Sequence, residues 1–348
     1  MDFADEEYPA APYPGRRPPG SFVHDDATGW TLTPAPGGWR VDTEDLDDWL
    51  VKRGAAPLND RVPVLCYGSN VCPSKITWLR AALGLDGPAV LLRARCTGLA
   101  AVWAAGLRVV DDQRPATLAA VPGNVEDHAL WLATPEQVMV LDRCEGRGER
   151  YRLVRVDTGE VRLEDGTVVD GPLAYTAAAP RRMPLLAGGR PVRCSDVPQS
   201  GAAALPGVPA DTDGLTTREL TGAPEPADFP GRVFVYGTLQ PHASDWWRLE
   251  PHATATHEAR IPGALYDTAL GYPALRLGAG PGVSGWVIHL AEPASALSEL
   301  DGYEGTEYRR IRIALPGGLL CWTYVWVNSI EGLRMLTAPW GDADPSRR

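Results

Sequence analysis

Two glutamates stand where a helix is expected to end, a position that suits acid–base chemistry. Glu145 and Glu304 each complete a Leu-Asp-x-x-Glu-Gly segment, in LDRCEG and LDGYEG. The negative end of the helix dipole disfavours a carboxylate there by about 0.3–1 kcal/mol, and burial adds to the effect. Both effects raise the pKa of a carboxyl group towards the working pH, as a general base requires. The alternative, which a single copy would favour, is a surface glutamate that pairs with a nearby arginine: Arg150, Arg152, Arg309 or Arg310.

A Tyr-Gly turn precedes each glutamate along the chain. The turns follow two strand-like segments, RVPVLC and RVFV, and consist of Tyr67, Gly68, Ser69 and Asn70 in the first case and of Tyr236, Gly237, Thr238 and Leu239 in the second. A glycine at a strand end permits a tight turn whose N–H groups converge on a carboxylate or a developing oxyanion. An ordinary turn with a core tyrosine fits the pattern equally well. Leu239 stands in the second turn where Asn70 stands in the first, so the second turn lacks a side-chain amide. We therefore expect the two turns to bind different substrates.

The two motifs recur in the same order, which indicates an internal repeat. A Tyr-Arg pair follows each glutamate, at Tyr151 and at Tyr308. Between the motifs lie strand-like segments such as LLRARCTGLAAVWA, IPGALYD, GYPALRL and SGWVIHL, and a short helix leads to each glutamate. Before Glu145, Thr134 and Gln137 predict a capping box. The pattern predicts a diverged tandem duplication of a mostly antiparallel α+β domain, and the repetition favours the chemical interpretation of the glutamates.

Composition divides the chain into five segments. We predict an acidic, Pro-rich mobile arm with a short helix at residues 1–60, followed by a first domain at residues 61–180. A Pro-, Gly- and Ala-rich linker at residues 181–229 leads to a second domain at residues 230–328. The chain ends in a fraying tail at residues 329–348.

Charge and residue usage narrow the function classes. The chain of 348 residues has a formal net charge of −11, which argues against nucleic-acid binding. No signal peptide is evident, and no apolar run approaches the roughly 20 residues that span a bilayer, so we expect a cytoplasmic protein with no membrane partner. The six cysteines are scattered, with no Cys-x-x-Cys pair, so neither a disulfide framework nor a metal site is predicted. No glycine-rich segment lies between a predicted strand and a predicted helix, as nucleotide binding requires, so we expect no cofactor.

The ordered set of motifs resembles the gamma-glutamylcyclotransferase-like family. VLCYGSN with LDRCEG is similar to the branch that acts on γ-glutamyl amino acids, and VFVYGTL with LDGYEG and YRR looks like the branch that includes the γ-glutamylamine cyclotransferases. The resemblance covers roughly residues 61–180 and 230–328. It implies two small β-barrels with flanking helices, which can pack on each other within the chain.

The resemblance also implies a reaction and a set of site residues. The α-amine of a small γ-glutamyl substrate attacks its own γ-carbonyl, releasing an amine or amino acid and 5-oxoproline without metal or cofactor. Glu145 and Glu304 would act as acid and base, and the two Tyr-Gly turns would bind the glutamyl group. Tyr151 and Tyr308 would line the pockets, although Tyr151 follows its glutamate at a longer spacing than Tyr308 does.

Two rival functions remain open from sequence. The domains could form a non-catalytic tandem that binds a ligand or partner, with glutamates that only pair with arginines. Alternatively, a related acyl-transfer enzyme could remove γ-glutamyl from a specialised metabolite or a protein side chain. Exposed glutamates without a facing cavity would favour the binding module, and a deep pocket would favour catalysis.

Overall fold

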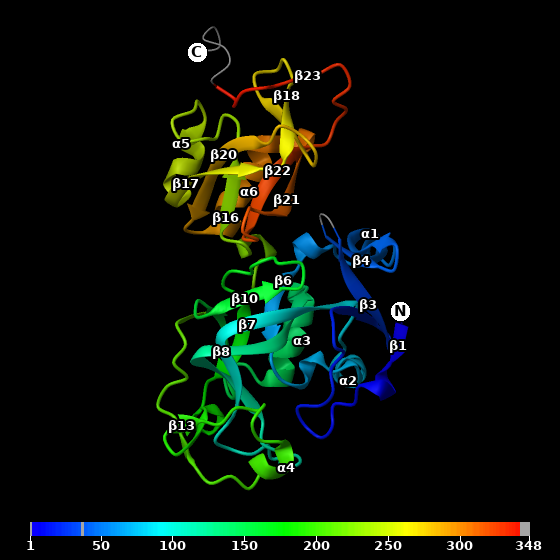
Figure 1. Cartoon of the computed structure of the whole chain (residues 1–348), viewed down its shortest axis with the longest axis vertical. Helices are drawn as coiled ribbons and strands as arrows, with labels where there is room; N and C mark the ends of the chain where they lie inside the picture. The colour runs from blue at the N-terminus through cyan, green and yellow to red at the C-terminus, as the bar shows by residue number, and fades with distance from the viewer. Residues whose placement is uncertain (1, 36–37, 342–348) are drawn as a thin grey trace. The chain divides into compact units, whose positions relative to one another are not determined.

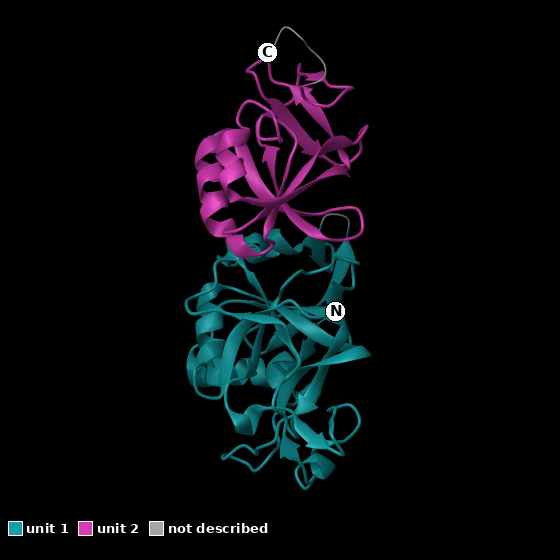
Figure 2. Cartoon of the chain, turned by 90° about the vertical axis from the view of Figure 1, so that its left-hand side faces the viewer, with its two compact units in different colours: residues 1–226 teal, residues 227–348 magenta. Residues whose placement is uncertain are grey.

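The computed structural model describes residues 2–35 and 38–341, and it divides the chain into two compact units, Met1–Pro226 and Ala227–Arg348 (Figure 1, Figure 2). The last part of the predicted tail, residues 342–348, lies outside the described residues.

The first unit contains a twelve-stranded sheet in the order β15-β9-β11-β6-β8-β7-β2-β3-β4-β5, with β1 beside β3 and β10 beside β7. The strands of this sheet are β1 (Asp2–Ala4), β2 (Phe22–Asp25), β3 (Thr28–Ala35), β4 (Gly38–Val41), β5 (Glu44–Asp45), β6 (Val62–Cys66), β7 (Ala89–Trp103), β8 (Ala116–Ala133), β9 (Tyr151–Val156), β10 (Glu160–Leu163), β11 (Leu173–Ala177) and β15 (Thr217–Glu219). A small second sheet contains β12 (Leu185–Ala187), β13 (Arg190–Pro191) and β14 (Val208–Pro209). The α-helices are α1 (Leu46–Val51), α2 (Pro73–Leu83), α3 (Pro135–Glu145) and α4 (Gln199–Ala202).

The second unit has two sheets, in the orders β17-β20-β16-β22-β21 and β19-β18-β23. The strands are β16 (Arg232–Val235), β17 (Ala253–Ile261), β18 (Gly263–Asp267), β19 (Pro273–Leu277), β20 (Val283–Leu290), β21 (Tyr308–Ala314), β22 (Leu320–Trp326) and β23 (Arg334–Met335). The α-helices are α5 (Trp246–Leu249) and α6 (Pro293–Glu304). Three predicted strands, in IPGALYD, GYPALRL and SGWVIHL, are confirmed as β18, β19 and β20.

Five strands in each unit follow the same plan. In the first unit, β6 is antiparallel to β8 and parallel to β11, while β7 and β9 pair antiparallel with β8 and β11. In the second, β16 is antiparallel to β20 and parallel to β22, while β17 and β21 pair antiparallel with β20 and β22. Each unit is therefore a mixed α+β structure in which the strand before the Tyr-Gly turn is central.

The prediction of β-barrels is wrong, because the sheets are open. A barrel forms only when the first and last strands of a sheet pair with each other. In the five-stranded sheet of the second unit, β17 pairs with β20 and β21 pairs with β22, and the described residues hold no pairing between β17 and β21. The sheet of the first unit likewise ends at β15 and β5.

Alternating side chains of β16 join two layers of the second unit. Val233 and Val235 lie in a core cluster with residues of α6, such as Leu297. Phe234 and Tyr236, the residue directly after β16, lie in a second cluster with residues of β17, β18 and β19. Since successive side chains of a strand point to opposite faces, α6 covers one face of the sheet and the small sheet covers the other (Figure 1).

The predicted mobile arm is instead part of the first sheet. Strand β2 pairs with both β3 and β7, which lies some seventy residues further along the chain, and Phe22 and Val23 are buried by this pairing. The predicted short helix is α1, whose N-cap is Asp45. The arm is acidic and rich in proline on average, so its few apolar residues did not indicate a strand. Pairing with a distant strand also produces no pattern in the nearby sequence that would predict it.

The predicted linker is also structured. Strand β15 pairs with β9, and the segment before it forms the small sheet and α4 within the first unit. The buried guanidinium of Arg114 donates hydrogen bonds to the carbonyl oxygens of Ala202 (2.7 Å) and Leu205 (3.3 Å). Side-chain hydrogen bonds can hold irregular backbone in place without any hydrophobic periodicity in the sequence. This segment therefore resembled a linker in sequence. Part of the predicted tail is ordered too, since β23 pairs with β18.

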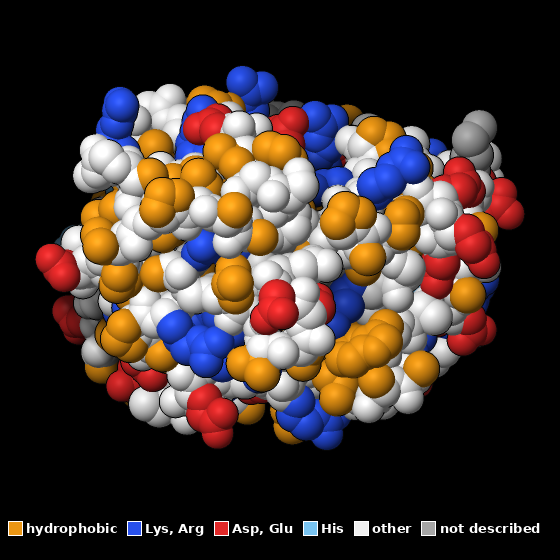
Figure 3. Space-filling model, turned by 90° about the horizontal axis from the view of Figure 1, so that it is seen from below, with side chains coloured by type: hydrophobic (Ala, Val, Ile, Leu, Met, Phe, Trp, Pro, Cys, Tyr) orange, Lys and Arg blue, Asp and Glu red, His pale blue; other side chains and the backbone are white. Residues whose placement is uncertain are grey.

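The face shown in Figure 3 carries charges of both signs, with Lys and Arg side chains interspersed among Asp, Glu and apolar side chains. Within residues 2–35 and 38–341, no helix is long and apolar enough to cross a bilayer.

Candidate active sites

Glu304 lines a small cavity of the second unit. It is the last residue of α6, and Gly305 follows at the C-cap with a positive φ of 63°, which favours glycine. Buried Leu297 and Leu300 fix the helix on the sheet. The cavity has a volume of about 180 Å³ and is lined by Phe234, Val235, Tyr236, Gly237, Thr238, Leu239, Tyr272, Pro273, Tyr303, Glu304, Glu307, Tyr308 and Tyr324. The structure thus brings together the predicted turn, the predicted glutamate and the predicted Tyr308.

The environment of Glu304 favours a bound proton. Burial, with a smaller contribution from the nearby carboxylate of Asp301, raises the pKa of Glu304 from 4.5 to about 8. A carboxyl group whose pKa lies near neutrality can both accept and return a proton at modest cost in free energy. This balance is what a single group needs to act first as base and then as acid.

Three tyrosines hold the frame around this cavity. The hydroxyl of Tyr236 donates to the carbonyl oxygen of Tyr324 (2.8 Å), and the Tyr324 hydroxyl donates to Asp301 Oδ1 (2.8 Å). The hydroxyl of Tyr308 donates to the carbonyl oxygen of Pro273 (2.8 Å). These bonds join the turn and α6 to β22, and β21 to β19. The side chains of Tyr236 and Tyr308 therefore support the cavity as well as line it.

Two further side chains of this cavity were missed by sequence reasoning. The Tyr303 hydroxyl of α6 is 3.0 Å from Oγ1 of Thr238 in the Tyr-Gly turn. Tyr272 donates to Glu307 Oε2 (2.6 Å). Tyr303 lies inside the glutamate motif, but the first unit has Cys144 at that position.

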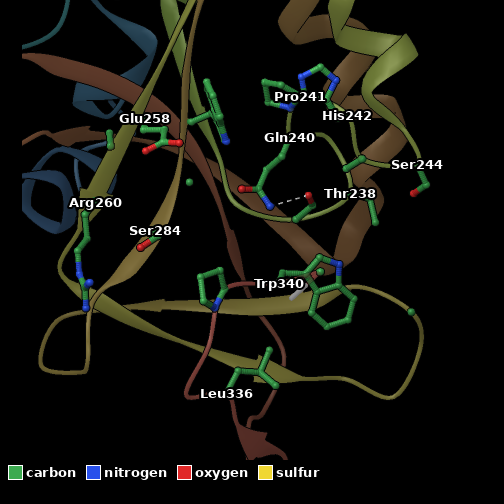
Figure 4. Close-up of a pocket in the computed structure, with 18 of the residues that line it drawn as sticks. Thr238, Gln240, Pro241, His242, Ser244, Glu258, Arg260, Ser284, Leu336 and Trp340 are labelled. Carbon is green, nitrogen blue, oxygen red and sulfur yellow. Dashed lines mark hydrogen bonds between the residues drawn. The ribbon is translucent and has the colours of Figure 1, made fainter. Parts of the chain in front are cut away.

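A larger groove adjoins the cavity, and both are lined by Gly237 and Thr238 (Figure 4). Its volume is about 1530 Å³. Figure 4 shows Gln240 beside the turn, where its Nε2 donates to the carbonyl oxygen of Gly237 (3.1 Å). The side chains of Glu258, Arg260 and Trp340 project from other parts of the wall. The groove offers room for a group that extends beyond the small cavity.

The first unit places Glu145 beside its own Tyr-Gly turn. Thr134 and Gln137 form the predicted capping box at the start of α3, and Gly146, with a φ of 65°, ends the helix. Asn70 Nδ2 donates to Glu145 Oε1 (2.7 Å), so the turn and the glutamate are in direct contact. Burial raises the pKa of Glu145, while the Asn70 hydrogen bond and the cations Lys75, Arg150 and Arg182 oppose that rise.

The same tyrosine frame surrounds Glu145. Tyr67 donates to the carbonyl oxygen of Tyr175, and Tyr175 donates to Asp142 Oδ1 (2.7 Å). Tyr151 donates to the carbonyl oxygen of Ala116 (2.9 Å), as Tyr308 does to Pro273. Tyr151 and Tyr308 are also the first residues of β9 and β21. The longer spacing after Glu145 therefore does not displace Tyr151 from the matching position.

Tyr13 of the predicted arm completes the surroundings of the first turn. A methyl group built on Gly68 would lie 2.6 Å from the Tyr13 hydroxyl oxygen, and this oxygen accepts the N–H of Ala116 (3.0 Å). In the second unit the ring of Pro273 takes the corresponding place, 3.2 Å from a methyl group built on Gly237. Proline has no N–H, so no acceptor is needed there. The sequence offered no signal for Tyr13, because its partners lie about 55 and 100 residues away.

Cysteine and metal chemistry find little support. Burial, together with the nearby Glu145 carboxylate, raises the pKa of the Cys144 thiol, which disfavours the nucleophilic thiolate. Across the described part of the chain, no group of three or more His, Cys, Asp or Glu side chains is arranged to hold a metal ion.

Comparisons with known proteins agree with the geometry of the second unit. Residues 233–342 match the family model described as gamma-glutamyl cyclotransferase, AIG2-like. No curated protein matches the chain in sequence.

Solved structures also align with parts of the chain. The ytfP protein of Escherichia coli is 29% identical over 32% of this chain and 96% of its own, with a TM-score of 0.25. YkqA of Bacillus subtilis is 16% identical over 77% of this chain and 85% of its own, with a TM-score of 0.25. A gamma-glutamyl cyclotransferase is 16% identical over 34% of this chain and 66% of its own, with a TM-score of 0.28. Because these TM-scores are low, the family-model match carries the comparison: the second unit contains one domain that matches the AIG2-like gamma-glutamyl cyclotransferases.

Proposed function

We propose that the second unit is a γ-glutamyl cyclotransferase that cleaves γ-glutamylamines, with Glu304 as its general acid and base. The observation that carries this proposal is a glutamate with a pKa of about 8 on the wall of a small cavity that the Tyr236–Leu239 turn also lines. The family-model match of residues 233–342 supports the same reaction class.

The reaction needs only what this cavity supplies. The substrate's α-amine attacks its γ-carbonyl carbon, the C–N bond to the leaving amine breaks, and 5-oxoproline remains. Glu304 takes a proton from the attacking nitrogen and returns it to the leaving nitrogen. N–H groups of the turn hold the carbonyl oxygen or the α-carboxylate. Because the attack is intramolecular, binding the substrate in a folded conformation provides much of the acceleration. The leaving amine extends towards the adjoining groove.

We further propose that the first unit arose by tandem duplication and carries a second cyclotransferase site at Glu145, which acts on γ-glutamyl amino acids. The support is the shared plan of five strands, the matching tyrosine frame, and the contact between Asn70 and Glu145. Neither site requires a metal or a cofactor in this mechanism.

The test is release of 5-oxoproline from γ-glutamylamines, γ-glutamyl amino acids and glutathione by the wild type, Glu145→Gln, Glu304→Gln and the double variant. We expect Glu304→Gln to lower turnover of γ-glutamylamines by about 10²–10⁴-fold, the usual contribution of a general acid–base group. The control is Glu299→Gln, which changes an exposed carboxylate on the same helix that pairs with His252.

Two results would contradict the proposal. One is a folded wild type that releases no 5-oxoproline from any substrate, which would leave a binding module or a substrate outside the panel. The other is full γ-glutamylamine turnover by the double variant. Loss of activity in Glu307→Gln but not in Glu304→Gln would move the acid–base role to Glu307, the other carboxylate of the cavity.

A further inference from the structure

Arg182 is a buried cation next to the first site. It is the last residue of a short 3-10 helix, η4 (Pro180–Arg182), which follows β11, and only 5% of it is exposed. Its backbone N–H is bonded to the carbonyl oxygen of Ala179 (2.8 Å), so the position of the residue is fixed by the turn itself.

The guanidinium of Arg182 lacks the partners that a structural arginine has. Within the described residues, its Nε and Nη1 atoms are buried and have no hydrogen-bond partner. Buried Arg114 differs, since its guanidinium donates to four backbone carbonyl oxygens. A buried charged donor without an acceptor is costly, so such a group points to an acceptor supplied by a ligand.

Arg182 lies beside Tyr151, a residue of the frame of the first site. Its guanidinium carbon is 5.9 Å from the centroid of the Tyr151 ring, and Tyr151 is the residue that donates to Ala116 in the site frame. The charge of Arg182 favours the ionised form of Glu145 and so opposes the rise in its pKa. The guanidinium, the tyrosine and the glutamate therefore share one electrostatic environment.

We propose that Arg182 binds a carboxylate of the substrate in the first site. The inference rests on the cyclotransferase function proposed above. Hydrogen bonds from a guanidinium to a carboxylate are strong because both groups are charged, and here two donor atoms, Nε and Nη1 on different sides of the guanidinium, have no partner. In the second unit, the segment that follows β22 is Val-Asn-Ser-Ile-Glu, residues 327–331, and contains no cation. Arg182 is thus a cation of the first site that has no counterpart in the corresponding segment of the second unit.

Two substrate carboxylates have the required chemistry: the α-carboxylate of the glutamyl group and the carboxylate of a leaving amino acid. The experiment separates them with γ-glutamyl-alanine and γ-glutamyl-ethylamide, because only the first has a carboxylate on its leaving group. KM and kcat are measured for both in the Glu304→Gln background, which silences the second site. The variants are Arg182→Met and Arg182→Lys, and the control is Arg181→Met, which removes the neighbouring exposed arginine that donates to the Leu107 carbonyl oxygen.

We expect Arg182→Met to raise KM for γ-glutamyl-alanine about tenfold or more, the size expected from losing a hydrogen-bonded ion pair, with a smaller change in kcat. Arg182→Lys should lie between Arg182→Met and the parent, since it keeps the charge but not the planar set of donors. An unchanged KM for γ-glutamyl-ethylamide would assign the leaving-group carboxylate, and an equal rise for both substrates would assign the glutamyl α-carboxylate. An unchanged KM for both substrates, or the same rise in Arg181→Met, would overturn the proposal.

A binding measurement separates this proposal from the proposed function. Calorimetric titration of γ-glutamyl-alanine into Glu145→Gln/Glu304→Gln reports binding without turnover. If the wild type releases no 5-oxoproline but this double variant binds the ligand and the added Arg182→Lys weakens binding, the cyclotransferase function fails and the carboxylate site stands. Binding that is absent, or unaffected by both Arg182 variants, refutes the carboxylate site. Thermal unfolding confirms that each variant is folded, and Arg182→Lys decides the outcome if Arg182→Met does not fold.

Discussion

The two sites share a frame but differ in what surrounds the glutamate. Glu304 has a carboxylate, Asp301, as its main charged neighbour, and its pKa rises to about 8. Glu145 accepts a hydrogen bond from Asn70 and is surrounded by cations, which oppose the effect of burial on its pKa. The wall beside the turn also differs, since Pro273 supplies it in the second unit and Tyr13 of a distant segment supplies it in the first.

Under the function proposed above, this difference tunes one frame towards two substrates. Tyrosine hydroxyls bonded to backbone carbonyl oxygens set the geometry of both sites, and these bonds do not depend on the substrate. Proton affinity and charge preference are instead set by side chains that differ between the units. Three experiments test this difference between the units, and they are given in order of decreasing effect.

Truncation of Tyr13 tests whether the arm belongs to the first site. We expect Tyr13→Ala to destabilise the first unit by about 3–5 kcal/mol, because a buried aromatic side chain is lost and the Ala116 N–H loses its acceptor. Turnover of γ-glutamyl amino acids should fall with it, while turnover of γ-glutamylamines is retained because Pro273 supplies that wall. Thermal unfolding and both assays measure this, with Tyr8→Ala as the control. A Tyr13→Ala protein with unchanged unfolding would show that the arm is dispensable.

The pH dependence of the two sites should differ. A glutamate acts as base only when ionised, so kcat/KM of the second site should rise about tenfold per pH unit from pH 6 and level off above about pH 8, the pKa of Glu304. We expect the first site to level off at a lower pH, because Asn70 and the cations favour the ionised form of Glu145. The profiles are recorded separately in Glu145→Gln and in Glu304→Gln. Coincident profiles would remove the electrostatic distinction between the sites.

Replacement of Asn70 should make the first site resemble the second. Asn70→Leu removes the 2.7 Å hydrogen bond to Glu145, so the pKa of Glu145 rises and the pH profile shifts upwards by about one unit, or about 1.4 kcal/mol. The measurement is kcat/KM against pH in the Glu304→Gln background, and Ser69→Ala is the control within the same turn. A profile that shifts to lower pH, or not at all, would show that Asn70 does not govern this pKa.

Local features of the fold were predictable because their causes are local. The capping box of Thr134 and Gln137 and the ends of α3 and α6 at a glutamate and a glycine depend on residues a few positions apart. The arm and the linker were mispredicted because β2 and β15 are held by pairing with β7 and β9, which no nearby residue signals. The open edges of the sheets are likewise a property of long-range strand pairing.

The sequence by itself determined the pair of motifs, their order and the chemistry that a carboxylate at a helix end can perform, since these follow from residue type and spacing. Only the tertiary structure decided which groups surround each carboxylate. Tyr13 and Arg182 acquire their influence through burial and proximity, and electrostatic effects strengthen steeply when water is excluded. The positions of such groups depend on contacts between residues far apart in the chain.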